Sequence, residues 1–259
     1  EGVVGRALKS VPRERVVVAT KSTVRRGGEW WKPARVIESL EGSLRVMGTD
    51  YVDVFNLHAI DPDMYDYARD ILAPALVREK EKGKIRHIGL TENPIVDFTN
   101  AALKRALADP VWEVFMVGFH MLHQGARQNV FPFTRAQGIG TLIMFAVRRI
   151  FADPPRIARE IKALAAKGLV EQWLGETDDP LGFLVHAGGA DSLTEAAYRF
   201  ARHEPGADVV LFGTGDAAHL RANIASLLKP PLPEPDRKRL AALFGRLTGI
   251  GLDGHQGQG

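Results

Sequence analysis

The stretch DVFNLHAID (Asp53–Asp61) is an apolar, strand-like run that leads to a histidine, His58. Upstream, RVVVATKS (Arg15–Ser22) is rich in β-branched residues and leads in the same way to a lysine, Lys21. A segment with helical spacing of apolar residues separates the two runs. In parallel βα folds the carboxyl ends of the strands carry the active site. The two runs therefore predict a parallel α/β fold with two ionisable side chains at neighbouring strand ends.

Six apolar segments alternate with helical patterns along the chain. Strands that are apolar throughout are buried on both faces, and helices between them indicate parallel strands with right-handed crossovers. We expect strands at residues 15–20, 51–58, 85–91, 112–119, 139–147 and 208–215. We expect helices at residues 32–48, 67–84, 95–108, 125–138, 154–168, 192–204, 216–228 and 236–245. One domain is expected over residues 1–247, followed by a flexible Gly/Gln-rich tail at 248–259.

Six such strands fit either an open doubly wound sheet or part of an eight-stranded barrel. No G-x-G-x-x-G motif follows the first strand, which disfavours the doubly wound sheet. A length of 259 residues is ordinary for a single (β/α)8 barrel.

The composition excludes several classes of protein. Hydrophobic residues make up 45% of the chain and charged residues 25%, as in a soluble globular protein. The net charge is only +3 and no basic cluster is interleaved with aromatic residues, so we expect no nucleic-acid partner. No apolar run approaches the roughly 20 residues that span a membrane. The absence of cysteine excludes disulfides and a cysteine nucleophile, and we expect a cytoplasmic protein.

Four motifs, in order and spacing, resemble the aldo-keto reductase superfamily. VVVATK resembles the family's third barrel strand, and MGTDYVDVFNLH resembles its fourth. EKGKIRHIGLTEN resembles the fifth-strand segment, and VVLFGTGDAAHLRANIASL resembles the eighth strand with the loop and helix that hold the adenosine phosphates. The similarity extends from Gly2 to Leu228.

This resemblance implies a (β/α)8 TIM barrel that uses NADP, with NAD possible, to reduce aldehydes or ketones or to oxidise the corresponding alcohols. The family's catalytic residues are Asp, Tyr, Lys and His, and the resemblance assigns Lys21 and His58 to the last two. The lysine lowers the pKa of the tyrosine, because a nearby cation favours phenolate. The histidine supplies a hydrogen bond where negative charge develops on the substrate oxygen.

The chain departs from the family pattern at the acid. The family's Asp and Tyr belong to a region that would precede Glu1, and no tyrosine of this chain stands at the matching position. The six strands expected in this chain, together with two that would precede Glu1, make up the eight strands of the barrel. We therefore expect the first two βα units to be absent from this chain, and this chain alone to be inactive.

The resemblance also assigns residues to the cofactor. Thr91 and Glu92 stand where the family has a Ser-Asn pair that binds the nicotinamide amide; Thr91 keeps a hydroxyl, but Glu92 as a carboxylate only accepts hydrogen bonds. Phe119 replaces a tyrosine, and Phe145 stands where an aromatic ring stacks on the nicotinamide. Glycines in the eighth-strand loop allow close approach to phosphate. The cofactor-binding residues expected from these matches are Thr91, Glu92, Phe119, Phe145, Gly213, Thr214, Gly215, His219 and Asn223.

Other interpretations remain open. Phe145 could belong to the core, and Arg148 could be an ordinary solvated side chain or could contact the pyrophosphate or an acidic substrate. The barrel could also be a regulatory module that binds the nicotinamide cofactor without catalysis. A metal-dependent hydrolase would need clustered ligands; His58, Asp61 and Asp63 are the only candidates, and Asp61-Pro62-Asp63 is more typical of a turn. We predict no metal site, and the substrate and oligomeric state stay open.

Overall fold

The computed structural model describes residues 1–252 and divides them into two compact units. The first unit comprises Glu1–Asp97, Ala101–Met116 and Thr134–Gly140. The second comprises Phe98–Asn100, Val117–Phe133 and the described residues from Thr141 onward. Residues 253–259 of the expected tail lie outside the described part of the chain.

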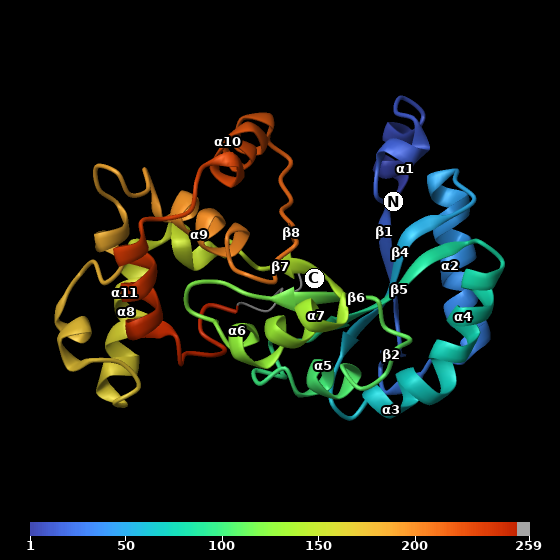
Figure 1. Ribbon diagram of the computed structural model, residues 1–259, viewed down its shortest axis with the longest axis horizontal. Helices are drawn as coiled ribbons and strands as arrows, with labels where there is room; N and C mark the ends of the chain where they lie inside the picture. Colours follow the sequence, from blue (N-terminus) through green and yellow to red (C-terminus); the bar gives the residue numbers. More distant parts are fainter. Residues whose placement is uncertain (253–259) are drawn as a thin grey trace. The chain divides into compact units, whose positions relative to one another are not determined.

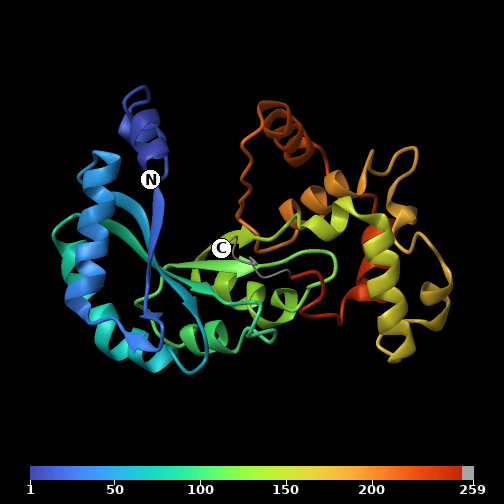
Figure 2. The ribbon, with the colours of Figure 1, turned by 180° about the vertical axis from the view of Figure 1, so that it is seen from behind.

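Parallel strands form the centre of the first unit. β1 (Ala19–Thr23) pairs with β4 (Val52–Ile60), β4 pairs with β5 (Ile85–Glu92), and β5 pairs with β6 (Val114–Gly118), all in parallel. The strands are therefore neighbours in sequence order, as expected of a βα repeat. Helices α2 (Pro33–Met47) and α4 (Ala73–Glu81) lie along one side of them in both views (Figures 1 and 2).

The first unit also contains short elements. They are α1 (Gly2–Leu8), a 3-10 turn (Arg13–Arg15), the hairpin strands β2 (Arg25–Arg26) and β3 (Glu29–Trp30), α3 (Tyr65–Tyr67), a π-helical turn (Ala68–Leu72) and α5 (Ala101–Ala106).

Asp53 fixes the register of these strands at their amino ends. Its carboxylate accepts hydrogen bonds from the Val18 backbone N–H at 2.8 Å and from Arg13 at 2.7 Å, and Arg86 lies at 2.8 Å from its other oxygen. These partners hold the pKa of Asp53 below its ordinary value although burial opposes this. One buried carboxylate thus ties together the segments that carry β1, β4 and β5.

The second unit contains the remaining strands and most of the later helices. β7 (Gly140–Met144) pairs in parallel with the short β8 (Val209–Val210). Helices α8 (Pro154–Ala166) and α11 (Glu234–Phe244) run side by side in both views (Figures 1 and 2). The other elements are α6 (Ala126–Asn129), α7 (Phe131–Gln137, shared with the first unit), α9 (Leu193–Arg202), α10 (Ala217–Leu228) and 3-10 turns at Arg149–Ala152, Gln172–Glu176 and Gly182–Leu184.

The expected strands are all present, but several boundaries differ. β1 starts at Ala19 and ends at Thr23, so that Lys21 lies within the strand instead of following it. The helix expected at 67–84 contains a π-helical turn that ends two residues before Pro74. Proline has no backbone N–H to donate to the preceding turn. The helix expected at 125–138 is broken at Val130, two residues before Pro132. The ends of three expected helices agree with caps in the structure: Gly48 caps the end of α2, and Ser192 and Asp216 cap the starts of α9 and α10.

Part of the expected tail belongs to the packed structure. The Gly249 backbone N–H donates to His123 Nδ1 at 2.8 Å, and Leu252 is buried. Within residues 1–252, no helix has both the length and the apolar character needed to cross a membrane.

Candidate active site

Lys21 and His58 face the same side of the first unit. Lys21 lies opposite Asn56 in the β1–β4 register, and Thr23 lies opposite His58. Side chains alternate along strands, so Lys21, Thr23, Asn56 and His58 share one face. Partial burial lowers the pKa of the Lys21 ammonium.

His58 is electrostatically linked to Lys21. Partial burial, and then the positive charge of Lys21, lower the pKa of His58 from 6.5 to about 4. The imidazole is therefore neutral at pH 7 and can offer a hydrogen bond without a charge. A lysine and a neutral histidine on adjacent strands form a pair that could orient and polarise a substrate oxygen.

Thr91 and Glu92 end the neighbouring strand β5, and both are buried. Thr91 Oγ1 accepts a hydrogen bond from the Ala59 backbone N–H at 2.6 Å. A hydroxyl that accepts one bond still carries an O–H donor, which a carboxamide oxygen would need. The structure thus gives Thr91 a contact to the His58 strand that the sequence did not predict.

The tyrosines of the first unit are engaged in structural contacts. The hydroxyl of Tyr65 contacts Asp109 and accepts from Trp112 Nε1 at 3.1 Å. Burial and Asp109 raise the pKa of Tyr65, the opposite of what a general acid requires. Tyr67 donates its hydroxyl to the Trp31 carbonyl at 3.1 Å.

Phe119 lies in the core of the second unit. It is fully buried, stacks on Phe200 with ring centroids 5.2 Å apart, and meets Phe131 edge to face at 5.1 Å. Aromatic neighbours of this kind fix a ring in place. The Phe119 ring therefore packs against other aromatic side chains of the core.

Two buried histidines follow Phe119. His120 Nδ1 accepts from the Leu122 backbone N–H at 3.2 Å, and His123 Nδ1 accepts from Gly249 at 2.8 Å. Each neutral ring therefore carries its proton on Nε2. Burial lowers the pKa of both rings, that of His123 to about 4. His123 has no sequence signal other than its position in the apolar segment after a strand.

Phe145 directly follows β7 and has an unusual backbone conformation. Its φ is 68°, in the left-handed region that bulky residues rarely occupy. The Arg148 guanidinium lies over its ring at 4.3 Å from the centroid. Such outliers concentrate at functional sites, which agrees with the predicted cofactor role of Phe145; that role stays a prediction.

The loop after β8 leaves space around its glycines. A Cβ added to Gly213 or Gly215 would meet no heavy atom within 4 Å, and both residues are exposed. Asp216 caps α10 by accepting from the His219 backbone N–H at 2.8 Å. The loop is therefore open around its glycines, and the Asp216 carboxylate occupies part of the N-terminus of α10.

The predicted residues fall into two groups. The first unit brings together Lys21, His58, Thr91 and Glu92. The second unit holds Phe119, Phe145, Gly213, Thr214, Gly215, His219 and Asn223. Among the residues that the structure describes, no group of three or more His, Asp or Glu side chains is arranged to hold a metal ion.

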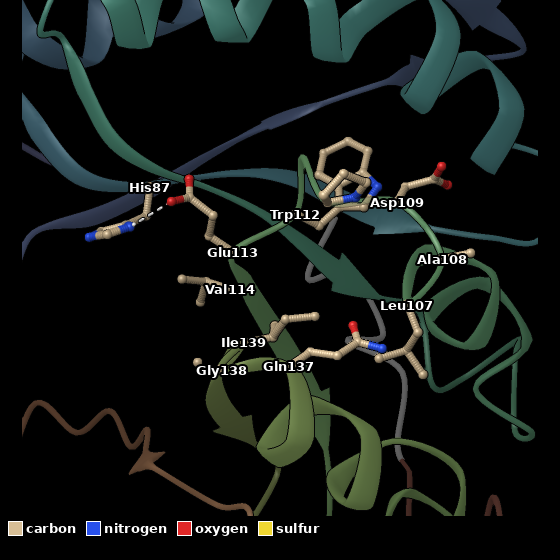
Figure 3. A pocket seen from close by; sticks show the side chains of 12 residues that line it. His87, Leu107, Ala108, Asp109, Trp112, Glu113, Val114, Gln137, Gly138 and Ile139 are labelled. Atoms are coloured by element: carbon tan, nitrogen blue, oxygen red, sulfur yellow. Dashed lines mark hydrogen bonds and ion pairs between the residues drawn. The ribbon is translucent and has the colours of Figure 1, made fainter.

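A separate pocket of about 670 Å³ opens at the amino ends of β5 and β6, away from the predicted residues (Figure 3). Two of its ionisable groups contact each other: His87 Nδ1 lies 3.2 Å from Glu113. Lys80, outside the pocket lining, lies 2.5 Å from the same carboxylate. The Ile88 backbone N–H also donates to Glu113 at 3.1 Å. Because this is the end of the strands opposite to Lys21 and His58, the pocket does not belong to the candidate active site.

The sequence profile of the aldo/keto reductase family matches residues 1–244. The chain belongs to the aldo/keto reductase family. L-galactose dehydrogenase from Arabidopsis thaliana is 30% identical over 144 residues, which cover 55% of this chain and 45% of the relative. The match to this curated relative thus spans less than half of the relative's length.

Solved aldo-keto reductases share the fold. The holo form of aldo-keto reductase AKR11C1 from Bacillus halodurans superimposes with a TM-score of 0.67 at 22% identity, covering 94% of this chain and 76% of that one. An aldo-keto reductase from Klebsiella pneumoniae in complex with NADP and acetate gives a TM-score of 0.63 at 19% identity, covering 94% and 75%. These similarities confirm the predicted α/β barrel class.

Proposed function

We propose that this aldo/keto reductase is an NAD(P)H-dependent oxidoreductase, or the greater part of one, that reduces aldehydes or ketones to alcohols. The observation that carries the proposal is the Lys21–His58 pair on adjacent parallel strands, with the charge of one lowering the pKa of the other. The Klebsiella relative with bound NADP supports NADP as the cofactor.

Each predicted site residue of this chain would have its own role in the reaction or in cofactor binding. When bound, the nicotinamide would supply the hydride, and water would supply the proton that completes the alcohol. Neutral His58 donates a hydrogen bond to the carbonyl oxygen, and Lys21 stabilises negative charge that develops beside it. The Thr91 hydroxyl donates to the carboxamide while Glu92 accepts from it. Phe145 supports the ring, and Gly213, Thr214 and Gly215 offer backbone N–H groups to phosphate, with His219 and Asn223 on the helix that follows.

A second candidate is a nicotinamide-binding regulatory module without catalysis. The observation that favours it is that Tyr65 and Tyr67 direct their hydroxyls to structural partners. The two functions share the cofactor and differ in turnover.

Cofactor binding is tested by titrating the 259-residue chain with NADPH and following nucleotide fluorescence. We expect Gly213→Asp to weaken binding at least about tenfold, which corresponds to about 1.4 kcal/mol, because it adds a negative charge beside the phosphates. Gly2→Asp is the matched control, since it also changes an exposed glycine with open space around it. Equal affinity in wild type and Gly213→Asp would contradict the assigned phosphate loop.

Turnover separates the two candidates. NADPH oxidation with glyceraldehyde, and NADP⁺ reduction with L-galactose, are measured by absorbance. We expect Lys21→Met and His58→Asn to lower kcat at least about 100-fold, since each removes stabilisation of the reacting oxygen. Lys104→Met, on the exposed side of α5, serves as the control. Turnover above background would support the catalytic function, whereas binding without turnover would agree with the regulatory module and with the expected inactivity of this chain alone.

A further inference from the structure

The backbone turns into the left-handed region directly after His58. Ala59 has a φ of 54°, and among the described residues only Asn100 and Phe145 are further non-glycine residues with positive φ. Asparagine tolerates this conformation because its short polar side chain can hydrogen-bond to nearby backbone, whereas alanine has no polar side chain. Such a conformation persists only where surrounding contacts hold it.

The same position carries a β-bulge between β4 and β5. Leu57 lies opposite Leu90, whereas Ile60 lies opposite Glu92, so three steps along β4 match two steps along β5. One extra residue in one strand is the definition of a bulge, and bulges beside active sites re-aim side chains.

The bulge decides which side chains share a face with His58. In a regular strand, residues 56, 58 and 60 would all point to one side. The extra residue instead places Ile60 on the face of Leu57, where it is fully buried. The face that carries Lys21, Asn56 and His58 is thereby kept clear of an isoleucine side chain.

Thr91 makes the contact that stabilises this conformation. Its Oγ1 accepts the Ala59 N–H at 2.6 Å, and the threonine is only 1% exposed. Gly89, two residues earlier on the same face, leaves room for Asn56, because a Cβ there would collide with the Asn56 side chain. Without the threonine oxygen the Ala59 N–H would lose its acceptor, which penalises the left-handed turn.

We propose that Thr91 is a positioning residue for His58: its hydroxyl oxygen holds the bulge at Ala59 that aims the imidazole toward Lys21. The role rests on the proposed function, since it orients a group of that site, and it is separate from any contact of the Thr91 O–H with a nicotinamide. One hydroxyl would thus serve as acceptor for the protein backbone and as donor for the cofactor.

The test follows the titration of His58 by NMR in the 259-residue chain without cofactor. The wild-type pKa is expected at about 4, because partial burial and Lys21 both disfavour the charged ring. Thr91→Val keeps the shape but removes the acceptor, so the bulge loosens, the ring gains water, and its pKa rises by at least about one unit toward 6.5. Thr91→Ser restores the oxygen and the low pKa.

A second pair of variants tests the bulge from the other strand. Ala59→Val places a β-branched residue at positive φ and is expected to raise the pKa of His58, whereas Ala59→Gly, which favours this conformation, leaves it low. With cofactor and substrate, Ala59→Val is expected to lower kcat while the dissociation constant for NADPH stays unchanged.

The outcomes separate this inference from the proposed function. An unchanged pKa of His58 in folded Thr91→Val, or in folded Ala59→Val should the threonine variant not fold, overturns the positioning role. Absence of turnover in the wild-type chain agrees with the expected inactivity of this chain alone and leaves the NMR result decisive for the bulge.

Discussion

In the first unit, Lys21, His58 and Thr91 lie on three hydrogen-bonded strands; in the second, Gly213, Thr214 and Gly215 follow a strand of two residues and are exposed. Helix α10, which comes next, has no buried residue. Reacting groups need fixed positions, and strand pairing supplies them. A loop that admits a phosphate needs accessible backbone N–H groups, which dense packing would remove. The two groups of residues are therefore held by different means.

The end of α10 shows how the second unit compensates for this sparse packing. Arg199, 5% exposed on α9, donates to the carbonyls of Gly189 at 2.7 Å, Pro230 at 2.8 Å and Pro231 at 3.1 Å. It also bonds the buried Glu195 at 2.9 Å. A single side chain thus anchors the segment that follows α10.

The largest expected effect comes from removing this anchor. Arg199→Met leaves the Glu195 carboxylate with one cation, Lys229, and leaves three carbonyls without their donor. We expect the free energy of unfolding to fall by about 3–5 kcal/mol, as for other broken buried ion pairs. Denaturant unfolding measures the change, and Arg202→Met on the exposed side of α9 is the control. An equal decrease in the free energy of unfolding in both variants would contradict the anchoring role of Arg199.

Acid is expected to affect the second unit through His123. Its pKa is about 4 in the folded chain against 6.5 ordinarily, so between these values the unfolded chain binds more protons. Stability is therefore lost as the pH falls from about 6.5 toward 4, by about 3 kcal/mol for this ring. The free energy of unfolding, followed across this pH range, should fall less steeply in His123→Asn than in the wild type. An equal dependence of the free energy of unfolding on pH in the wild type and in His123→Asn would contradict the buried neutral state of His123.

A pair of glycines gives the smallest effect and the most direct contrast. A Cβ at Gly89 would collide with the Asn56 side chain and lie 2.6 Å from the Val114 carbonyl oxygen. We expect Gly89→Ala to lower the free energy of unfolding by about 2–3 kcal/mol. Gly213→Ala meets open space and should change it by less than about 0.5 kcal/mol. Thermal unfolding of Gly89→Ala and Gly213→Ala compares the strand with the loop. Similar decreases in the free energy of unfolding would mean that the loop is packed as tightly as the strands.

The sequence predicted features that arise from local pattern. Apolar runs placed the parallel strands, and the helices expected at residues 32–48 and 216–228 end and begin at Gly48 and Asp216, which are caps in the structure. Lys21 and His58 were predicted to be neighbours, and the register places them on one face. The hairpin of β2 and β3 was missed although Gly27-Gly28 between two short polar–aromatic segments could have indicated it.

Other features depend on contacts that no local pattern encodes. Alanine has no preference for positive φ, so the turn at Ala59 follows from Thr91, which lies 32 residues away. The buried state of His123 depends on a backbone N–H from Gly249, 126 residues later. The roles assigned to Phe145, His219 and Asn223 remain predictions.

The bonded pair of Trp112 and Tyr65 has an optical consequence. Trp112 is 1% exposed in the first unit, whereas Trp173 in the second unit is 45% exposed beneath Arg239. A soluble quencher such as iodide would reach the second indole and not the first. The fluorescence of this chain therefore contains a shielded emitter, Trp112, an accessible one, Trp173, and two half-buried ones, Trp30 and Trp31. Variants that keep only Trp112 or only Trp173 would report the loosening of each unit as denaturant is added.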